Sequence, residues 1–266
     1  MMTSQRSNCE DMLNRVEQDN TCGFCGGPGL TKEHVWPDWL LKLILESRDS
    51  AGQKTFTMEV ENAARTKRFA STTLESTVRM PCAKCNNGWM SALEGDVKPF
   101  MAGMVFPGEK TILTHERQSV PARWAVKTAM VFEWVAKPEP YFTADERSKF
   151  RTFQQVPSNL RVWLGYYDAM QPAHAIQHRI GLVRGNGRVS QAYSLTLTAN
   201  FLVMQVFAYR NPGPPGEQIP VTPGPWKDAL LRISPVGDDL MMWPPKLTMD
   251  NKGLEMLDSR FVRSGK

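Results

Sequence analysis

The sequence contains no long hydrophobic run, and this absence argues against a membrane-spanning segment. The longest apolar stretch, at residues 39–45, is interrupted by Lys42 and is far shorter than the roughly 20 residues that cross a bilayer. Residues 1–20 are polar and carry charges of both signs, unlike the apolar segment of a secretory signal. We therefore expect a cytoplasmic protein without a membrane partner.

Internal repeats and low-complexity tracts are also missing. The 266 residues, of which 41% are hydrophobic and 22% charged, suit one large globular domain or two small ones. The net charge of +5 is uneven: residues 1–110 hold 13 basic and 14 acidic side chains, and residues 111–266 hold 19 and 13. The basic excess predicts phosphate contacts in the C-terminal part or, more simply, a mildly basic solvated surface.

Cysteine is scarce, but four of the five cysteines stand in two Cys-x-x-Cys pairs, Cys22 with Cys25 and Cys82 with Cys85. In a reducing compartment such pairs favour metal binding over disulfides. Two pairs complete the closed tetrahedral sulfur shell of a structural Zn²⁺ ion, whose binding contributes to folding. The alternative is two unrelated redox or incidental motifs. Cys9 has no partner in the sequence and is predicted to be a free thiol.

Pro and Gly at residues 106–110 mark the best boundary in the chain. We expect an N-terminal arm (1–20), a cysteine-bounded module (21–106) and a second domain (111–266) in an α+β fold with an antiparallel sheet. Periodicity and capping signals predict helices at 38–46, 87–104, 121–136, 143–153 and 252–262. They predict strands at 54–61, 67–73, 76–80, 160–167, 179–183, 193–198, 201–208 and 230–233, with a hairpin turn at 185–187.

Two short segments between and after the cysteine pairs carry the most specific chemistry. Glu33 and His34 follow Cys25 by eight and nine residues, and Asn86 and Asn87 follow Cys85 directly. Cys-x-x-Cys, an acidic residue with His, and Cys-x-x-Cys-Asn at a helix start resemble the HNH endonuclease family, in its branch stapled by a four-cysteine zinc. The resemblance covers residues 20–105 and implies a ββα-metal fold.

The resemblance implies a role for each of these residues. His34 matches the general base that activates water, and a neutral imidazole suits that task. Glu33 and Asn86 match ligands of a catalytic divalent cation such as Mg²⁺, which prefers oxygen donors. The simpler alternatives are a His34 that only packs within the module and asparagines, Asn86 and Asn87, that only cap a helix.

The sequence departs from the family pattern in three places: the middle Asn is missing, Asn86 stands where His is more usual, and Trp89-Met90 replaces a basic residue of the helix. The middle Asn, which orients the base, is absent before the third cysteine, and Thr77 or Asn87 are the candidates to replace it. We therefore expect a metal-dependent endonuclease acting on nucleic acid, DNA favoured over RNA. The alternative is a non-catalytic zinc module that binds nucleic acid or protein. In a third reading, residues 111–266 are the working part and the module is a scaffold.

Overall fold

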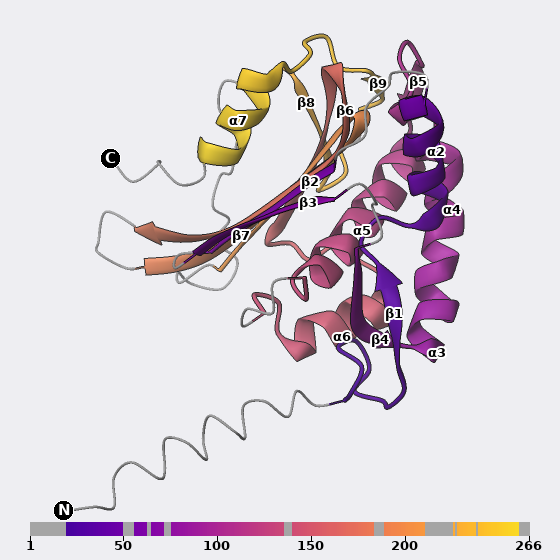
Figure 1. The fold of residues 1–266 in the computed structure, drawn as a ribbon, viewed down its shortest axis with the longest axis vertical. Helices are drawn as coiled ribbons and strands as arrows, with labels where there is room; N and C mark the ends of the chain where they lie inside the picture. Colours follow the sequence, from indigo (N-terminus) through magenta and orange to yellow (C-terminus); the bar gives the residue numbers. More distant parts are fainter. Residues whose placement is uncertain are drawn as a thin grey trace, which may run out of the picture.

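The computed structural model describes residues 20–49, 56–62, 65–71, 76–135, 140–183, 189–210, 226, 228–237 and 239–260. A large five-stranded sheet runs through this part of the chain, with helix α7 (Asn251–Arg260) on one face and helix α5 (His115–Phe132) on the other (Figure 1). The predicted α+β class is confirmed, because helices pack on a mainly antiparallel sheet.

The centre of the sheet is a long hairpin of β6 (Leu160–Val183) and β7 (Val189–Tyr209). Side chains alternate between its faces, as in any strand. In β7, Met204 and Val206 face the core that contains α5, whereas Val203 and Phe207 face the smaller core beneath α7. Strand β8 (Leu230–Ser234) pairs antiparallel with β6.

The two long strands correct the prediction of four shorter ones. Residues 160–183 form one strand, because register shifts between Tyr166 and Ala173 accommodate part of the segment that separates the two predicted strands. Opposite this irregularity, Asn200 takes a φ of 52°, which Asn tolerates better than most residues, and β7 continues past it. The predicted turn at 185–187 lies outside the described residues, although Val183 and Val189 pair across it.

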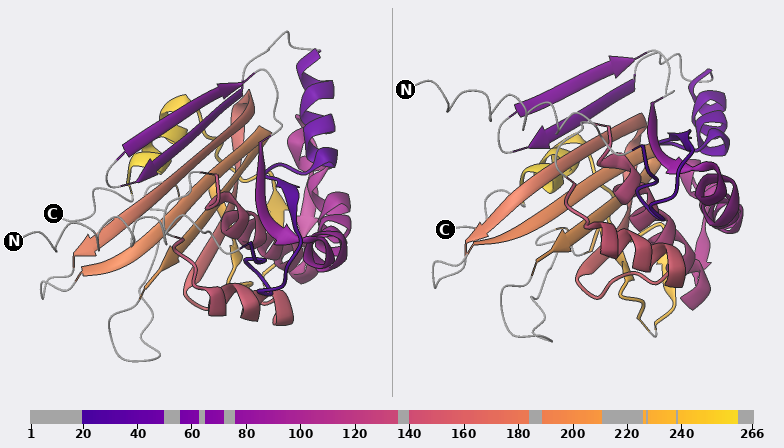
Figure 2. Two further views of the ribbon diagram at one scale, coloured as in Figure 1. Left: turned by 60° about the horizontal axis from the view of Figure 1, so that its bottom comes forward. Right: turned by 90° about the horizontal axis from the view of Figure 1, so that it is seen from below.

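Strands β2 (Phe56–Asn62) and β3 (Arg65–Ser71) form an antiparallel hairpin that lies along the large sheet (Figure 2). Residues 57–60 of β2 pair with residues 174–177 of β6 in parallel. A segment between the two cysteine pairs in sequence is therefore part of the same sheet as the C-terminal strands. The two predicted units share a sheet.

The cysteine-bounded module itself is a short antiparallel pair followed by helices. Strand β1 (Leu30–His34) pairs with β4 (Thr77–Cys82), and the chain continues through α3 (Ala83–Cys85), η1 (Asn86–Met90), α4 (Ser91–Met101) and η2 (Gly103–Val105). Helix α2 (Asp38–Asp49) follows β1. Buried side chains of this module and of the large sheet belong to one continuous core.

Helix α5 starts at His115, six residues before the predicted start at Pro121, because Thr114 caps it by accepting a hydrogen bond from the Arg117 N–H. Helix α6 (Ala144–Phe153) begins at the predicted capping box, in which Thr143 and Glu146 hydrogen-bond each other's backbone N–H. Strands β5 (Thr111–Leu113) and β9 (Met241–Trp243) pair with each other beside α5.

Candidate functional site

The four paired cysteines converge at one end of the β1–β4 pair. Leu30 lies opposite Cys82 in the ladder, which brings the turn before β1 next to the end of β4. The four Sγ atoms lie within 4.8 Å of one another, and Cys25 Sγ is 3.6 Å from Cys82 Sγ. Tetrahedral Zn²⁺ with sulfur at about 2.3 Å separates its ligands by roughly 3.8 Å. The cluster therefore has the donor set and spacing to hold a metal ion such as zinc.

The local environment shifts the pKa values of the cysteine thiols in different directions. Burial raises the pKa of Cys85 to about 12, with contacts to neighbouring thiols adding to it. Burial acts in the same direction on Cys82, but the Cys85 backbone N–H and the neighbouring thiols outweigh it and lower the pKa of Cys82 to about 7. A metal ion bound by all four must hold them as thiolates.

The first cysteine turn is held by an arginine from the C-terminal part. Nε of Arg147 donates to the carbonyl oxygen of Gly23, between Cys22 and Cys25, at 2.7 Å. A second nitrogen, Nη1, donates to the carbonyl oxygen of Phe142. The guanidinium also lies 4.7 Å from the ring centroid of Trp134, and the residue is buried. One side chain thus joins α6 and the segment after α5 to the turn between Cys22 and Cys25.

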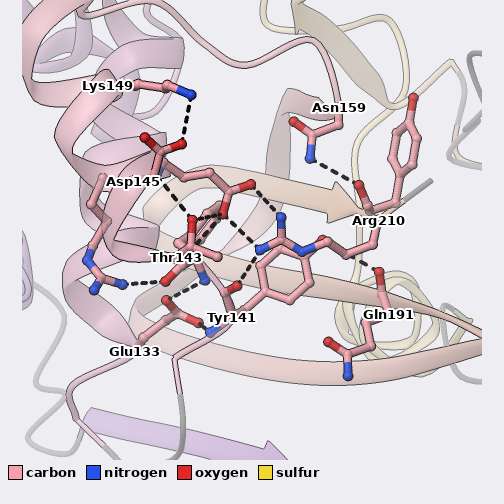
Figure 3. A network of polar contacts seen from close by, with 12 residues as sticks. Glu133, Tyr141, Thr143, Asp145, Lys149, Asn159, Gln191 and Arg210 are labelled. Atoms are coloured by element: carbon pink, nitrogen blue, oxygen red, sulfur yellow. Dashed lines mark hydrogen bonds and ion pairs between the residues drawn. The ribbon is translucent and has the colours of Figure 1, made fainter. Parts of the chain in front are cut away.

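Helix α6, which carries Arg147, is anchored to β7 by a polar network (Figure 3). Arg210 forms an ion pair with Glu146, 2.6 Å from Nη1 to Oε1, and donates to the Tyr141 carbonyl oxygen at 2.6 Å. Nearby, the buried carboxylate of Glu133 accepts hydrogen bonds from the backbone N–H groups of Tyr141 and Phe142. These contacts hold helix α6, and with it Arg147, in place.

A groove of about 590 Å³ opens between the end of β1, α2 and the η1–α4 helix. It brings together all four residues that the motif predicts, namely Glu33, His34, Asn86 and Asn87. Other charged side chains that line it are Lys32, Asp38, Lys42, Glu46, Glu94 and Lys98. The described residues that line the groove therefore have mixed charge, with no excess of basic side chains.

His34 has a carboxylate beside its ring. Nδ1 of His34 lies 3.4 Å from Oδ1 of Asp38, the first residue of α2. A carboxylate only accepts hydrogen bonds, so this contact favours a proton on Nδ1 and leaves Nε2 to accept one. Among the described residues, Asp38 rather than Thr77 or Asn87 makes this contact. The sequence signal was an acidic residue four positions after His34, which the motif does not include.

Glu33 points into the protein, toward a lysine that sequence analysis missed. Its Oε1 lies 3.2 Å from Nζ of Lys127 in α5, and Nζ also lies 2.8 Å from Oε1 of Glu94 in α4. Burial raises the pKa of Glu33, Lys127 opposes this, and the charge of Glu94 adds to it. Burial alone lowers the pKa of Lys127, but Glu94 and Glu33 outweigh it and raise the pKa, so the ammonium stays charged.

Asn86 bridges the helix start to β1. Its Nδ2 donates to the Lys32 carbonyl oxygen at 3.0 Å and to Oγ1 of Thr31 at 3.1 Å. The Thr31 hydroxyl donates its own proton to the Pro81 carbonyl oxygen. Both partners accept, so the atom facing them is the amide nitrogen, and Oδ1 is the one side-chain atom of Asn86 that can bind a cation. No side-chain cap of the helix is formed here. Asn87 is exposed at the groove.

A scan against protein-family models finds no matching family, and searches of characterised proteins and of solved structures find no match. In the described part of the chain, no helix has the length and apolar character needed to cross a membrane.

Proposed function

We propose that this protein is a metal-dependent nuclease of the HNH type, which hydrolyses phosphodiester bonds of nucleic acid, with DNA favoured over RNA. The observation that carries the proposal is the imidazole of His34, placed at a groove by β1 and paired through Nδ1 with Asp38. The succession of β1, β4 and a helix that starts beside the fourth cysteine supports it.

His34 acts as the general base in this proposal. Its side chain is 38% exposed, which lets water reach the ring from the groove. Asp38 favours the tautomer with a proton on Nδ1 and stabilises the imidazolium that forms when Nε2 takes a proton from the attacking water. A positioned general base of this kind accelerates hydrolysis by about 10²- to 10⁴-fold.

The groove also holds the oxygen donors that a divalent cation such as Mg²⁺ prefers. The groups that would hold it are Oδ1 of Asn86 and the carboxylates of Glu33 and Glu94. Once bound, the cation would stabilise negative charge on the phosphate and the leaving oxygen. Lys32, Lys42 and Lys98 are exposed along the groove and supply candidate phosphate contacts.

The four-cysteine cluster has a separate, structural role in this proposal. Four thiolates around Zn²⁺ leave no open coordination position, so the ion serves folding and not hydrolysis. It ties the turn before β1 to the end of β4, and thereby fixes the strand that presents His34. Loss of zinc would remove the site by releasing β1.

The second candidate function is a non-catalytic module that binds nucleic acid or protein. One observation favours it: Oε1 of Glu33, the expected cation ligand, is already engaged by the ammonium of Lys127. A binding module needs no such ligand. The two functions differ in whether a folded, zinc-loaded protein cleaves a phosphodiester bond.

Nicking of supercoiled plasmid by purified protein with Mg²⁺ or Mn²⁺ decides between them. We expect divalent-dependent nicking that His34→Ala abolishes. The matched control is His115→Ala, which removes an exposed histidine at the start of α5 and is expected to nick like the wild type. A folded wild type without nicking on DNA or RNA substrates would count against the nuclease and direct attention to gel-shift assays.

A further inference from the structure

Lys127 is a charged residue in the middle of an otherwise apolar helix face. Its side chain is 1% exposed, and the nearby apolar residues Val126 and Ala129 of α5 belong to the main core. An unpaired ammonium in such a place would be strongly destabilising, so the position demands a partner. Lys127 does not line the groove, yet both of its carboxylate partners do.

The three charges come from three elements that lie far apart in sequence. Glu33 is in β1, Glu94 is in α4, and Lys127 is in α5, outside the predicted module. One ammonium faces two carboxylates at 3.2 and 2.8 Å, so the group carries a net charge of −1 when all three are ionised. Without the ammonium, two carboxylates would share a largely water-excluded position under the groove and would repel each other.

The two partners differ in how they can respond to loss of the cation. The side chain of Glu94 is 23% exposed and can turn toward water, whereas that of Glu33 is 9% exposed. Glu33 lines the groove with only this small exposed fraction, so a larger contact with water would require movement of β1. That strand is five residues long, pairs with one strand in the described part of the chain and contains a register shift, so few ladder hydrogen bonds hold it. His34 is the next residue and would move with it.

We infer that Lys127 is a positioning residue of the site, which holds Glu33 in place from beneath and thereby fixes the direction of the neighbouring His34. The side chains of adjacent strand residues have a fixed direction relative to each other, so anchoring the Glu33 side chain also fixes the direction of His34 at the groove. The part of this inference that concerns hydrolysis rests on the proposed nuclease function. The geometric part, that Lys127 sets the environment of His34, does not.

The experiment combines a conformational readout with the nicking assay. Nitrogen-edited NMR of histidine side chains reports the tautomer and surroundings of each of the four histidines separately. The variants are Lys127→Met, which keeps the unbranched stem, and the double variant Glu33→Gln/Lys127→Met, which removes both charges. The control is Lys149→Met, which removes an exposed lysine from its ion pair with Asp145.

We expect Lys127→Met to shift the His34 signals and lose the Nδ1-protonated signature, while the other three histidines and Lys149→Met stay unchanged. The double variant should restore the His34 signals, because a neutral amide at position 33 needs no cation. In the nicking assay, kcat of Lys127→Met should fall by at least tenfold, with KM changed less than threefold. The double variant need not regain kcat, since it lacks the Glu33 carboxylate.

Unchanged His34 signals in a folded Lys127→Met protein would overturn the inference. If Lys127→Met does not fold but the double variant does, the unpaired Glu33 is the cause and the coupling stands. If neither folds, Lys127 serves the core and not the site, and the inference fails. A wild type that never nicks would refute the nuclease proposal alone, because the histidine spectra still report whether Lys127 positions His34.

Discussion

Replacing Arg147 by Met tests whether the C-terminal part holds the turn between Cys22 and Cys25 in place. The change keeps most of the buried stem but removes the guanidinium. The carbonyl oxygens of Gly23 and Phe142 then lose their charged donor, and Trp134 loses its cationic neighbour. Because Gly23 lies between Cys22 and Cys25, we expect the effect to reach the metal.

The contacts set the size of the effect. Hydrogen bonds from a charged donor contribute about 1.5–3 kcal/mol each, and the contact with Trp134 contributes about 1 kcal/mol. Removing the guanidinium also removes the unfavourable free energy of burying it, which offsets roughly half of this sum. We therefore expect the free energy of unfolding to fall by about 3 kcal/mol, which lowers Tm by roughly 5 °C for a chain of this length. If the whole loss appeared in zinc binding, the affinity would fall about 100-fold.

Two measurements check the prediction: Tm of the zinc-loaded protein, and the rate of zinc transfer to a chromogenic chelator. Arg151→Met is the matched control, because it makes the same change one turn further along α6. We expect Arg147→Met to release zinc faster than this control and to melt at a lower temperature. Equal release rates and equal Tm values in the two variants would show that Arg147 does not hold the turn.

Three further predictions concern the metal, the base and pH. Cys82→Ser should lower zinc content from one ion to none per chain and disrupt the β1–β4 pair, measured by elemental analysis and near-ultraviolet circular dichroism. Asp38→Asn should reduce the nicking rate roughly tenfold without weakening plasmid binding, since an amide can favour the wrong tautomer of His34 but the contact is exposed to water. Burial raises the pKa of Glu133 to about 7, although the N–H groups of Tyr141 and Phe142 oppose it. Between these two pKa values the folded chain keeps a proton on Glu133 that the unfolded chain, with an ordinary pKa of 4.5, has lost. The free energy of unfolding should therefore fall by about 3 kcal/mol from roughly pH 4.5 to pH 7. Thermal melts of Glu133→Gln should not show this pH-dependent loss of stability.

The features that the sequence predicted well depend on local signals. The capping box at Thr143 needs residues only three positions apart, and the structure forms it as expected. The Cys-x-x-Cys pairs likewise carry their own geometry, and the structure brings the two pairs together. Predicted helix and strand positions outside the large hairpin differ from the observed ones mainly at their ends.

Long-range pairing could not be predicted in this way. The hairpin of β2 and β3 has strand-like composition, but nothing in its residues indicates that β2 pairs in parallel with residues 174–177 of β6. The same limit applies to β6 itself, since a polar segment with a proline predicts an end, whereas pairing with β7 carries the strand through. Such outcomes depend on partners that are distant in the sequence.

In the candidate site, too, residues with local sequence signals were predicted and a residue that depends on distant contacts was not. Glu33, His34, Asn86 and Asn87 were found because they adjoin the cysteine pairs, and the structure places them around one groove. Lys127 was missed because a single lysine in an apolar helical pattern predicts a residue at the edge of a buried face. Its burial becomes favourable only when β1 and α4 supply Glu33 and Glu94, and neither contact can be read from α5 alone.

Two positively charged side chains of the C-terminal part contact the cysteine cluster and the groove of the N-terminal part. Arg147 holds the cysteine turn, and Lys127 holds the carboxylate next to His34. A module of residues 21–106 taken alone would leave Glu33 and Glu94 without their shared ammonium and the Gly23 carbonyl without its donor. Activity or metal affinity measured on such a fragment would therefore describe a different site. The C-terminal part is therefore a structural component of the candidate site.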